Sequence, residues 1–169
     1  MLFGFYKKYR QEILGGLFCL SLGILSGYMV KKGDSAWYLN LVKPKFNPPS
    51  FVFAPVWTTL YIMIGIAFGK MCKSRNTKLQ ILFLTQFILN LAWSPLFFYY
   101  QRIDLALIDL VAIWLCACIL MFHVKQNQAL LFLLIPYFLC ITFAGILNFS
   151  IYVMNYFLIL CNTDNLFSD

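Results

Sequence analysis

The stretch FNPPSFVFAPVWTTLYIMIGIAFG, residues 46–69, decides the fold, because it carries no charge over a length sufficient to cross a membrane. A helix needs about 20 mostly apolar residues to span the hydrocarbon core of a bilayer. Three more uncharged stretches lie within Glu12–Lys31, Lys78–Arg102 and Lys125–Asp164. A fifth apolar stretch, residues 105–122, is interrupted once, by Asp109. The sequence therefore predicts an all-α integral membrane protein, a bundle of five transmembrane helices.

The composition agrees with this prediction and leaves no room for a second domain. Hydrophobic residues make up 62% of the chain and charged residues only 11%, far from the usage of soluble domains. We expect a single membrane domain over residues 1–169. No small-residue cleavage site follows the basic N-terminus, so no cleavable signal peptide is predicted. The predicted spans are residues 13–30, 51–70, 79–100, 104–123 and 129–160.

The net charge of +7 indicates lipid rather than nucleic acid as the partner. Most lysines and arginines lie in short loops, where they meet lipid headgroups. With five spans, 8 of the 13 basic residues fall on the side of the N-terminus, which favours an inward N-terminus. We expect a multi-pass integral membrane protein, with the bacterial cytoplasmic membrane slightly favoured over the mitochondrial outer membrane.

The first loop, residues 31–50, is the longest predicted connection between spans. Its sequence KKGDSAWYLNLVKPKFNPPS contains three prolines, which restrict the backbone, and the aromatic residues Trp37 and Tyr38. Aromatic side chains suit a membrane interface, and long loops in compact proteins often act as lids. The loop is therefore interpreted either as a lid or as a plain interfacial connector.

Polar and aromatic residues form faces on three of the predicted helices. Trp57 and Tyr61 share a face of the second span, and Gln86, Asn90 and Trp93 share one on the third. The fifth span adds Tyr137, Cys140 or Ile141, Ala144, Leu147 and Asn148. Converging faces of this kind suit a flat, apolar ligand with a few polar atoms. The alternative is that these side chains only form hydrogen bonds between helices.

Other candidate residues leave their roles open. Asp109 lies about a turn inside the fourth span, where a carboxylate indicates a proton path or a ligand partner but also suits the helix dipole. His123 is interpreted as an interfacial residue. Two G-x-x-x-G segments, 23–27 and 65–69, permit close helix contact within the chain or in a dimer. The six cysteines show no metal or redox spacing, and no hydrolase or phosphoryl-transfer motif is present.

Several of these motifs together resemble the TspO/MBR family, which includes the translocator protein and the tryptophan-rich sensory proteins. The block KPxFxPP…PVWTxLY is the most specific of them. The stretches that carry the resemblance are WYLNLVKPKFNPPSFVFAPVWTTLYIMIGIAFG (37–69), LNLAWSPLFF (89–98), ALIDL (106–110) and PYFLCITFAGILNFSIYVMN (136–155). They include the first loop and four of the five spans, so the resemblance covers nearly the whole chain.

The resemblance implies a five-helix bundle, often a homodimer, whose cavity is capped by the first loop. It also implies porphyrin binding, with haem-type tetrapyrroles as ligands and no required cofactor. We therefore expect a membrane receptor or carrier for tetrapyrroles and similar flat hydrophobic ligands. Carried over by motif, the ligand-binding residues would be Trp37, Phe53, Ala54, Trp57, Tyr61, Asn90, Trp93, Ala144, Leu147 and Asn148.

Two departures from the family pattern bear on alternative functions. Cys140 stands where many members carry a second cavity tryptophan within PYxxW, and some bacterial relatives use that residue with the PVW tryptophan in light- and oxygen-dependent porphyrin breakdown. Enzymatic activity of this kind is therefore expected to be weak or absent here. No Lys or Arg follows Lys125, so the cholesterol-associated pattern of the fifth helix is incomplete. A proton-coupled transporter that uses Asp109 is a further alternative.

Overall fold

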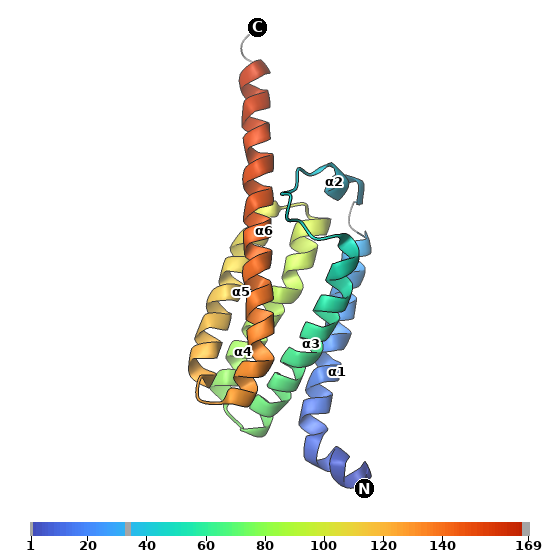
Figure 1. Ribbon diagram of the computed structural model, residues 1–169, viewed down its shortest axis with the longest axis vertical. Helices are drawn as coiled ribbons and strands as arrows, with labels where there is room; N and C mark the ends of the chain where they lie inside the picture. The colour runs from blue at the N-terminus through green and yellow to red at the C-terminus, as the bar shows by residue number, and fades with distance from the viewer. Residues whose placement is uncertain (1, 33–34, 167–169) are drawn as a thin grey trace.

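The computed structural model describes residues 2–32 and 35–166, with side chains placed for residues 6–28 and 36–156. All regular structure in these ranges is helical. Five long helices run side by side and antiparallel from one to the next, and a short helix, α2, lies across one end of the bundle (Figure 1). The elements are α1 (Leu2–Lys32), α2 (Ser35–Asn40), α3 (Ser50–Lys73), α4 (Thr77–Ser94), a π-helical turn η1 (Pro95–Tyr99), α5 (Ile103–Val124) and α6 (Gln128–Leu166).

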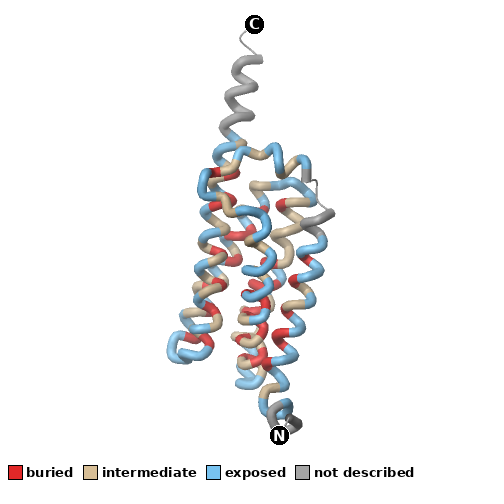
Figure 2. The backbone as a smooth tube through the Cα atoms, turned by 45° about the vertical axis from the view of Figure 1, so that its right-hand side comes forward, coloured by how far each residue is buried: buried red, intermediate tan, exposed pale blue. Residues whose placement is uncertain are grey.

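In the part of the chain that the structure describes, five helices are long and apolar enough to cross a membrane, which confirms the predicted fold class. Within an 18-residue window of each candidate span, only 28% to 33% of the residues are buried. The buried residues line the inward sides of the helices, and the outward sides are exposed along the bundle (Figure 2). Large apolar residues occupy this outer surface, such as Ile108, Phe132 and Phe149. Lipid is the environment that suits such a surface, because backbone groups are satisfied within the helices and apolar side chains face outward.

Two of the described helices, α4 and α6, begin with an asparagine cap. The Asn76 side chain accepts a hydrogen bond from the Leu79 amide at 3.3 Å. The Asn127 side chain does the same for the Leu130 amide at 3.2 Å. Each cap satisfies an amide that has no partner within its own helix.

A wide turn, η1, ends α4 before the loop that leads to α5. Pro95 has no amide hydrogen, so the Leu91 carbonyl loses its helical partner; the Ser26 hydroxyl of α1 bonds to that carbonyl instead, at 3.4 Å. The Tyr100 amide then donates to the Pro95 carbonyl at 2.9 Å, which closes the π-helical turn. This turn directs Phe97 to the interior, where it is buried.

Glycines allow α1 and α3 to approach until their backbones touch. This contact assigns a role to one of the two G-x-x-x-G segments, residues 65–69. A β-carbon built on Gly65 would lie 2.4 Å from the Gly15 carbonyl oxygen, and one on Gly69 would lie 2.2 Å from the Gln11 carbonyl oxygen. Because α1 covers this face, Gly65 and Gly69 serve packing within the chain. Gly27 differs, since a β-carbon there would meet nothing within 4 Å.

Gly23 supports a side chain of the predicted site. A β-carbon at this position would lie 2.2 Å from Cδ2 of the Tyr61 ring. The bare backbone of α1 therefore leaves the space in which the Tyr61 ring lies, and Tyr61 is buried.

Candidate functional site

The two aromatic residues of α3 lie together, as their spacing predicts. The ring centroids of Trp57 and Tyr61 are 5.6 Å apart. The Tyr61 hydroxyl donates to the Asn90 side-chain oxygen of α4 at 3.0 Å, and this pair is buried. The hydrogen bond fixes both groups and links two of the three faces identified from the sequence.

A stack of aromatic rings connects α4 to α2. Trp93 stacks on Phe97 with ring centroids 5.2 Å apart, and Trp37 of α2 meets Phe97 edge-on at 5.7 Å. The indole nitrogen Nε1 of Trp93 is buried and has no hydrogen-bond partner. A buried donor without a partner is costly, so a polar atom of a ligand that reached this donor would gain a hydrogen bond.

The polar residue of the α6 face, Asn148, is also buried. Asn148 is 1% exposed, and its Nδ2 donates to the Ile103 carbonyl at 3.3 Å. Its Oδ1 is buried without a partner. Trp93 and Asn148 therefore present one unused donor and one unused acceptor inside the bundle.

The predicted residues fall into two adjoining apolar clusters. Trp57, Tyr61 and Ala144 belong to the larger cluster in the middle of the bundle, and Trp93 contacts both clusters. The smaller cluster, beneath the lid, contains Leu147 with Phe53 and Trp37 packed against it. Ala54 belongs to neither cluster and is exposed.

A set of buried polar side chains lies in the middle of the bundle, and we call Gln86, Asn90, Asp109 and Tyr137 the polar floor. The Tyr137 hydroxyl donates to the Gln86 Oε1 at 2.5 Å, and the Asn90 side chain lies near the same hydroxyl. Gln86 Nε2 and Asp109 Oδ2 are buried without hydrogen-bond partners. Gln86, Asp109 and Tyr137 are absent from the predicted ligand set, although Gln86 lies one turn before Asn90 on the same face.

Cys140 is half-buried and packs against the larger cluster, which contains Tyr61 and Tyr137. Five cysteines in the described residues are free thiols. No group of three His, Cys, Asp or Glu side chains gathers there to hold a metal ion.

Residues 35–49, which we call the lid segment, cover the smaller cluster. Tyr38 packs on Phe98 with ring centroids 5.4 Å apart, and Phe46 meets Phe143 of α6 at 6.2 Å. Burial raises the pKa of the Tyr38 phenol, an effect that its hydrogen bond with Asn47 opposes. Since Phe97 and Leu147 are buried beneath the lid segment, a ligand that approaches them from this end must displace it.

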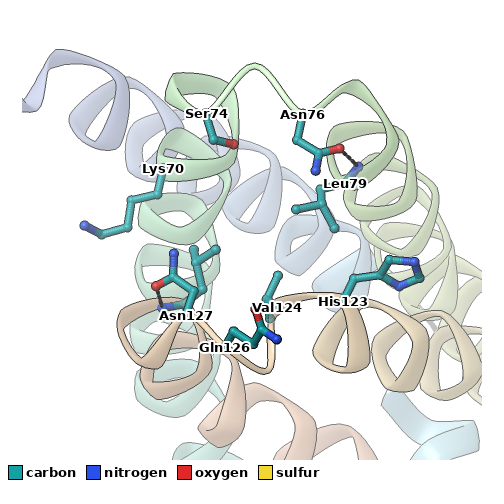
Figure 3. A pocket seen from close by; sticks show the side chains of 9 residues that line it. Lys70, Ser74, Asn76, Leu79, His123, Val124, Gln126 and Asn127 are labelled. Atoms are coloured by element: carbon teal, nitrogen blue, oxygen red, sulfur yellow. Dashed lines mark hydrogen bonds between the residues drawn. The ribbon is translucent and has the colours of Figure 1, made fainter.

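At the opposite end of the bundle, the α3–α4 and α5–α6 loops enclose an open depression of about 340 Å³. Its rim carries Lys70, Ser74, Asn76 and His123, as Figure 3 shows. The His123 Nδ1 lies 2.8 Å from the Ile119 carbonyl oxygen. None of the predicted ligand-binding residues lines this depression.

The fold and the interior residues together define a class: a multi-pass membrane protein with an aromatic and polar interior beneath the short helix α2. Residues 16–154 match the family model of the TspO/MBR family. The chain belongs to this family, which confirms the resemblance found from the motifs.

Curated relatives support the assignment along most of their length. The tryptophan-rich protein TspO of Chlorobaculum tepidum is 36% identical over 143 residues, which cover 81% of this chain and 90% of the relative. The protein CrtK of Rhodobacter capsulatus is 34% identical over 128 residues, covering 71% and 79%. The translocator protein of Bos taurus is 33% identical over 143 residues, covering 80% and 85%. The chain is therefore similar to bacterial and mammalian members.

Proposed function

We propose that this chain is a membrane receptor or carrier that binds tetrapyrroles, such as protoporphyrin and haem-type ligands, between the helices beneath the lid segment. The observation that supports this most is the pair of unused polar atoms, on Trp93 and Asn148, in an interior where Trp93 contacts the cluster that holds Trp57 and Tyr61. Aromatic rings supply contact area for a flat macrocycle. The Trp93 donor and the Asn148 acceptor, both buried without partners, would orient its polar groups.

We propose that the chain requires no cofactor, since the porphyrin is the ligand itself. We also propose that two copies of the chain form a homodimer. The Gly65–Gly69 face is not available for the dimer contact, because α1 packs directly against it. The contact would therefore form through one of the lipid-facing surfaces of the bundle.

Quenching of tryptophan fluorescence by protoporphyrin in the dark tests the proposal. We expect saturable quenching in the micromolar range, which corresponds to about −8 kcal/mol. Trp57→Phe should weaken the affinity by about tenfold, because the smaller ring loses contact area with the macrocycle. The matched control is Trp114→Phe: Trp114 belongs to α5 and donates to the Thr142 hydroxyl at 3.0 Å.

The two tryptophan variants separate specific binding from partition into detergent. An affinity that falls with Trp57→Phe and holds with Trp114→Phe supports a site at the α3 aromatic pair. Linear quenching that neither substitution alters would contradict the proposal, because it reports partition of the porphyrin into micelles. Empty micelles and inner-filter correction supply the baseline.

A second candidate function is proton-coupled transport, which the buried carboxylate of Asp109 favours. Its Oδ2 has no hydrogen-bond partner, and unpaired carboxylates inside a membrane bundle are costly. This candidate predicts pH-dependent uptake of porphyrin into proteoliposomes that Asp109→Asn abolishes. Asp104→Asn is the control, since Asp104 lies on the same helix but is paired at the surface with Arg102 at 2.6 Å. Unchanged uptake with Asp109→Asn would remove this candidate.

A further inference from the structure

A single side chain of α6 holds the backbone of the lid segment through paired hydrogen bonds. Asn155 Nδ2 donates to the Val42 carbonyl at 2.9 Å. Its Oδ1 accepts from the Val42 amide at 3.0 Å. The side-chain amide thus bonds to both backbone groups of one residue, as a neighbouring strand would do in a sheet. The two partners are 113 residues apart in the chain.

A third bond fixes the orientation of this amide. Asn155 Nδ2 also donates to the Ile151 carbonyl of its own helix at 2.8 Å. Both hydrogens of the amide group are then used, and its oxygen is used by the Val42 amide. Rotating the amide by half a turn would place its hydrogens against the Val42 amide and lose all three bonds. The side chain is therefore held ready to bond the lid segment.

The lid segment is also braced internally. The Lys43 amine donates to the Leu41 carbonyl at 3.0 Å and to the Leu39 carbonyl at 3.3 Å, near the end of α2. The same amine lies over the Tyr38 ring, 4.5 Å from its centroid. These bonds connect residues of the lid segment to one another, so the segment can move as a unit without breaking them. The bonds between Asn155 and Val42, in contrast, must break when the lid segment moves away from α6.

We propose that Asn155 is a positioning residue that sets the rates of ligand uptake and release by holding the lid segment over the interior. The inference rests on the proposed function, since it assumes a ligand beneath the lid. Asn155 does not need to touch the ligand for this role. Loss of its bonds to Val42 destabilises the closed lid and leaves the aromatic residues of the site in place.

Stopped-flow measurement of protoporphyrin binding to the full chain, native and Asn155→Ala, tests the role. We expect dissociation and association each to become about tenfold faster, a factor that corresponds to about 1.4 kcal/mol. Because both rates rise together, the dissociation constant should change by less than about threefold. Asn155→Asp keeps the size and the acceptor oxygen but loses the donated bond, so it should shift both rates in the same direction. Ser150→Ala is the control, since Ser150 bonds only within α6 at the Ile146 carbonyl in the contacts described.

A second readout needs no ligand. Ile151 is buried in the cluster beneath the lid segment, so a cysteine placed there by Ile151→Cys should react with a charged thiol reagent only when the lid opens. We expect this reaction to be about tenfold faster with Asn155→Ala than in the native background, as for the ligand rates. Mass spectrometry of the peptide that contains residue 151 separates this site from the native cysteines.

The two readouts distinguish a failure of the proposed Asn155 role from a failure of the proposed function. Unchanged thiol reactivity and unchanged ligand rates would overturn the role of Asn155 and leave the tetrapyrrole proposal intact. A weaker affinity in which only one of the two rates changes would also overturn it, because that result indicates general damage to the site. If the native chain shows no saturable binding, the proposed function fails, and thiol reactivity alone then decides whether Asn155 holds the lid.

Discussion

Replacing Gly65 with alanine should lower the apparent unfolding temperature of the detergent-solubilised protein by about 10 °C, from a loss of about 3 kcal/mol of stability. The added β-carbon would lie 2.4 Å from the Gly15 carbonyl oxygen and 2.6 Å from the Gly16 α-carbon. Both obstacles are backbone atoms, which cannot rotate away as a side chain does. The two helices must separate, and every contact along their crossing weakens.

Gly27→Ala is the matched control for this prediction. Gly27 belongs to the same bundle and has nothing within 4 Å of an added β-carbon. Alanine there should leave the unfolding temperature unchanged or raise it slightly, since alanine is the better helix former by up to about 1 kcal/mol. Equal unfolding temperatures for the Gly65 and Gly27 variants, measured by thermal unfolding in the same detergent, would contradict the close crossing of α1 and α3.

Replacing Ala144 with phenylalanine should reduce the affinity for protoporphyrin by about a hundredfold, or about 2.7 kcal/mol. Ala144 packs against the same cluster as Trp57 and Tyr61. A phenyl ring at this position would occupy the volume that the proposed ligand needs next to these aromatic residues. Titration of the dark fluorescence, as for Trp57→Phe, measures the change.

Ile146→Phe provides the comparison, because Ile146 lies two residues away on α6 with its side chain on the exposed surface. This substitution adds a similar ring that faces lipid, and the affinity should stay within about twofold of the native value. If both variants bind protoporphyrin as the native chain does, the ligand does not lie beside α6 at this depth. Unfolding temperatures close to native for both variants would exclude misfolding as the cause of any loss.

The five spans could be predicted from the sequence because charged residues mark their ends. Apolar residues favour lipid and charged residues favour water whatever their neighbours are. The spans can therefore be located without knowing how the helices pack. The predicted first span starts at residue 13, whereas α1 begins at Leu2. Residues 7–12, four of which are charged, are compatible with a helix outside the bilayer, so composition marks the span but not the helix end.

The faces of the site could be predicted, but their partners could not. Spacing places Gln86 and Asn90 on one side of a helix, yet it does not say that Gln86 meets Tyr137 while Asn90 meets Tyr61. Those pairings depend on how far each helix is rotated and where it crosses its neighbour. In the sequence, Asn155 stands out only as the last residue of the stretch 136–155 that resembles the family. Its bond to Val42 could not be predicted, because the two residues are 113 positions apart. The π-helical turn at Pro95 is similarly a product of contacts, because Ser26 of another helix satisfies the carbonyl that the proline leaves free.

Gly23 contributes nothing to the surface that a ligand would touch, yet the Tyr61 ring lies where any larger residue at position 23 would be. A side chain there would push the ring toward Trp57 and Asn90. The space available to the Tyr61 ring therefore depends on α1, a helix that supplies no residue of the predicted site. Natural variants with altered ligand selectivity need not carry changes in the residues that line the interior, and α1 is where such remote changes would be sought.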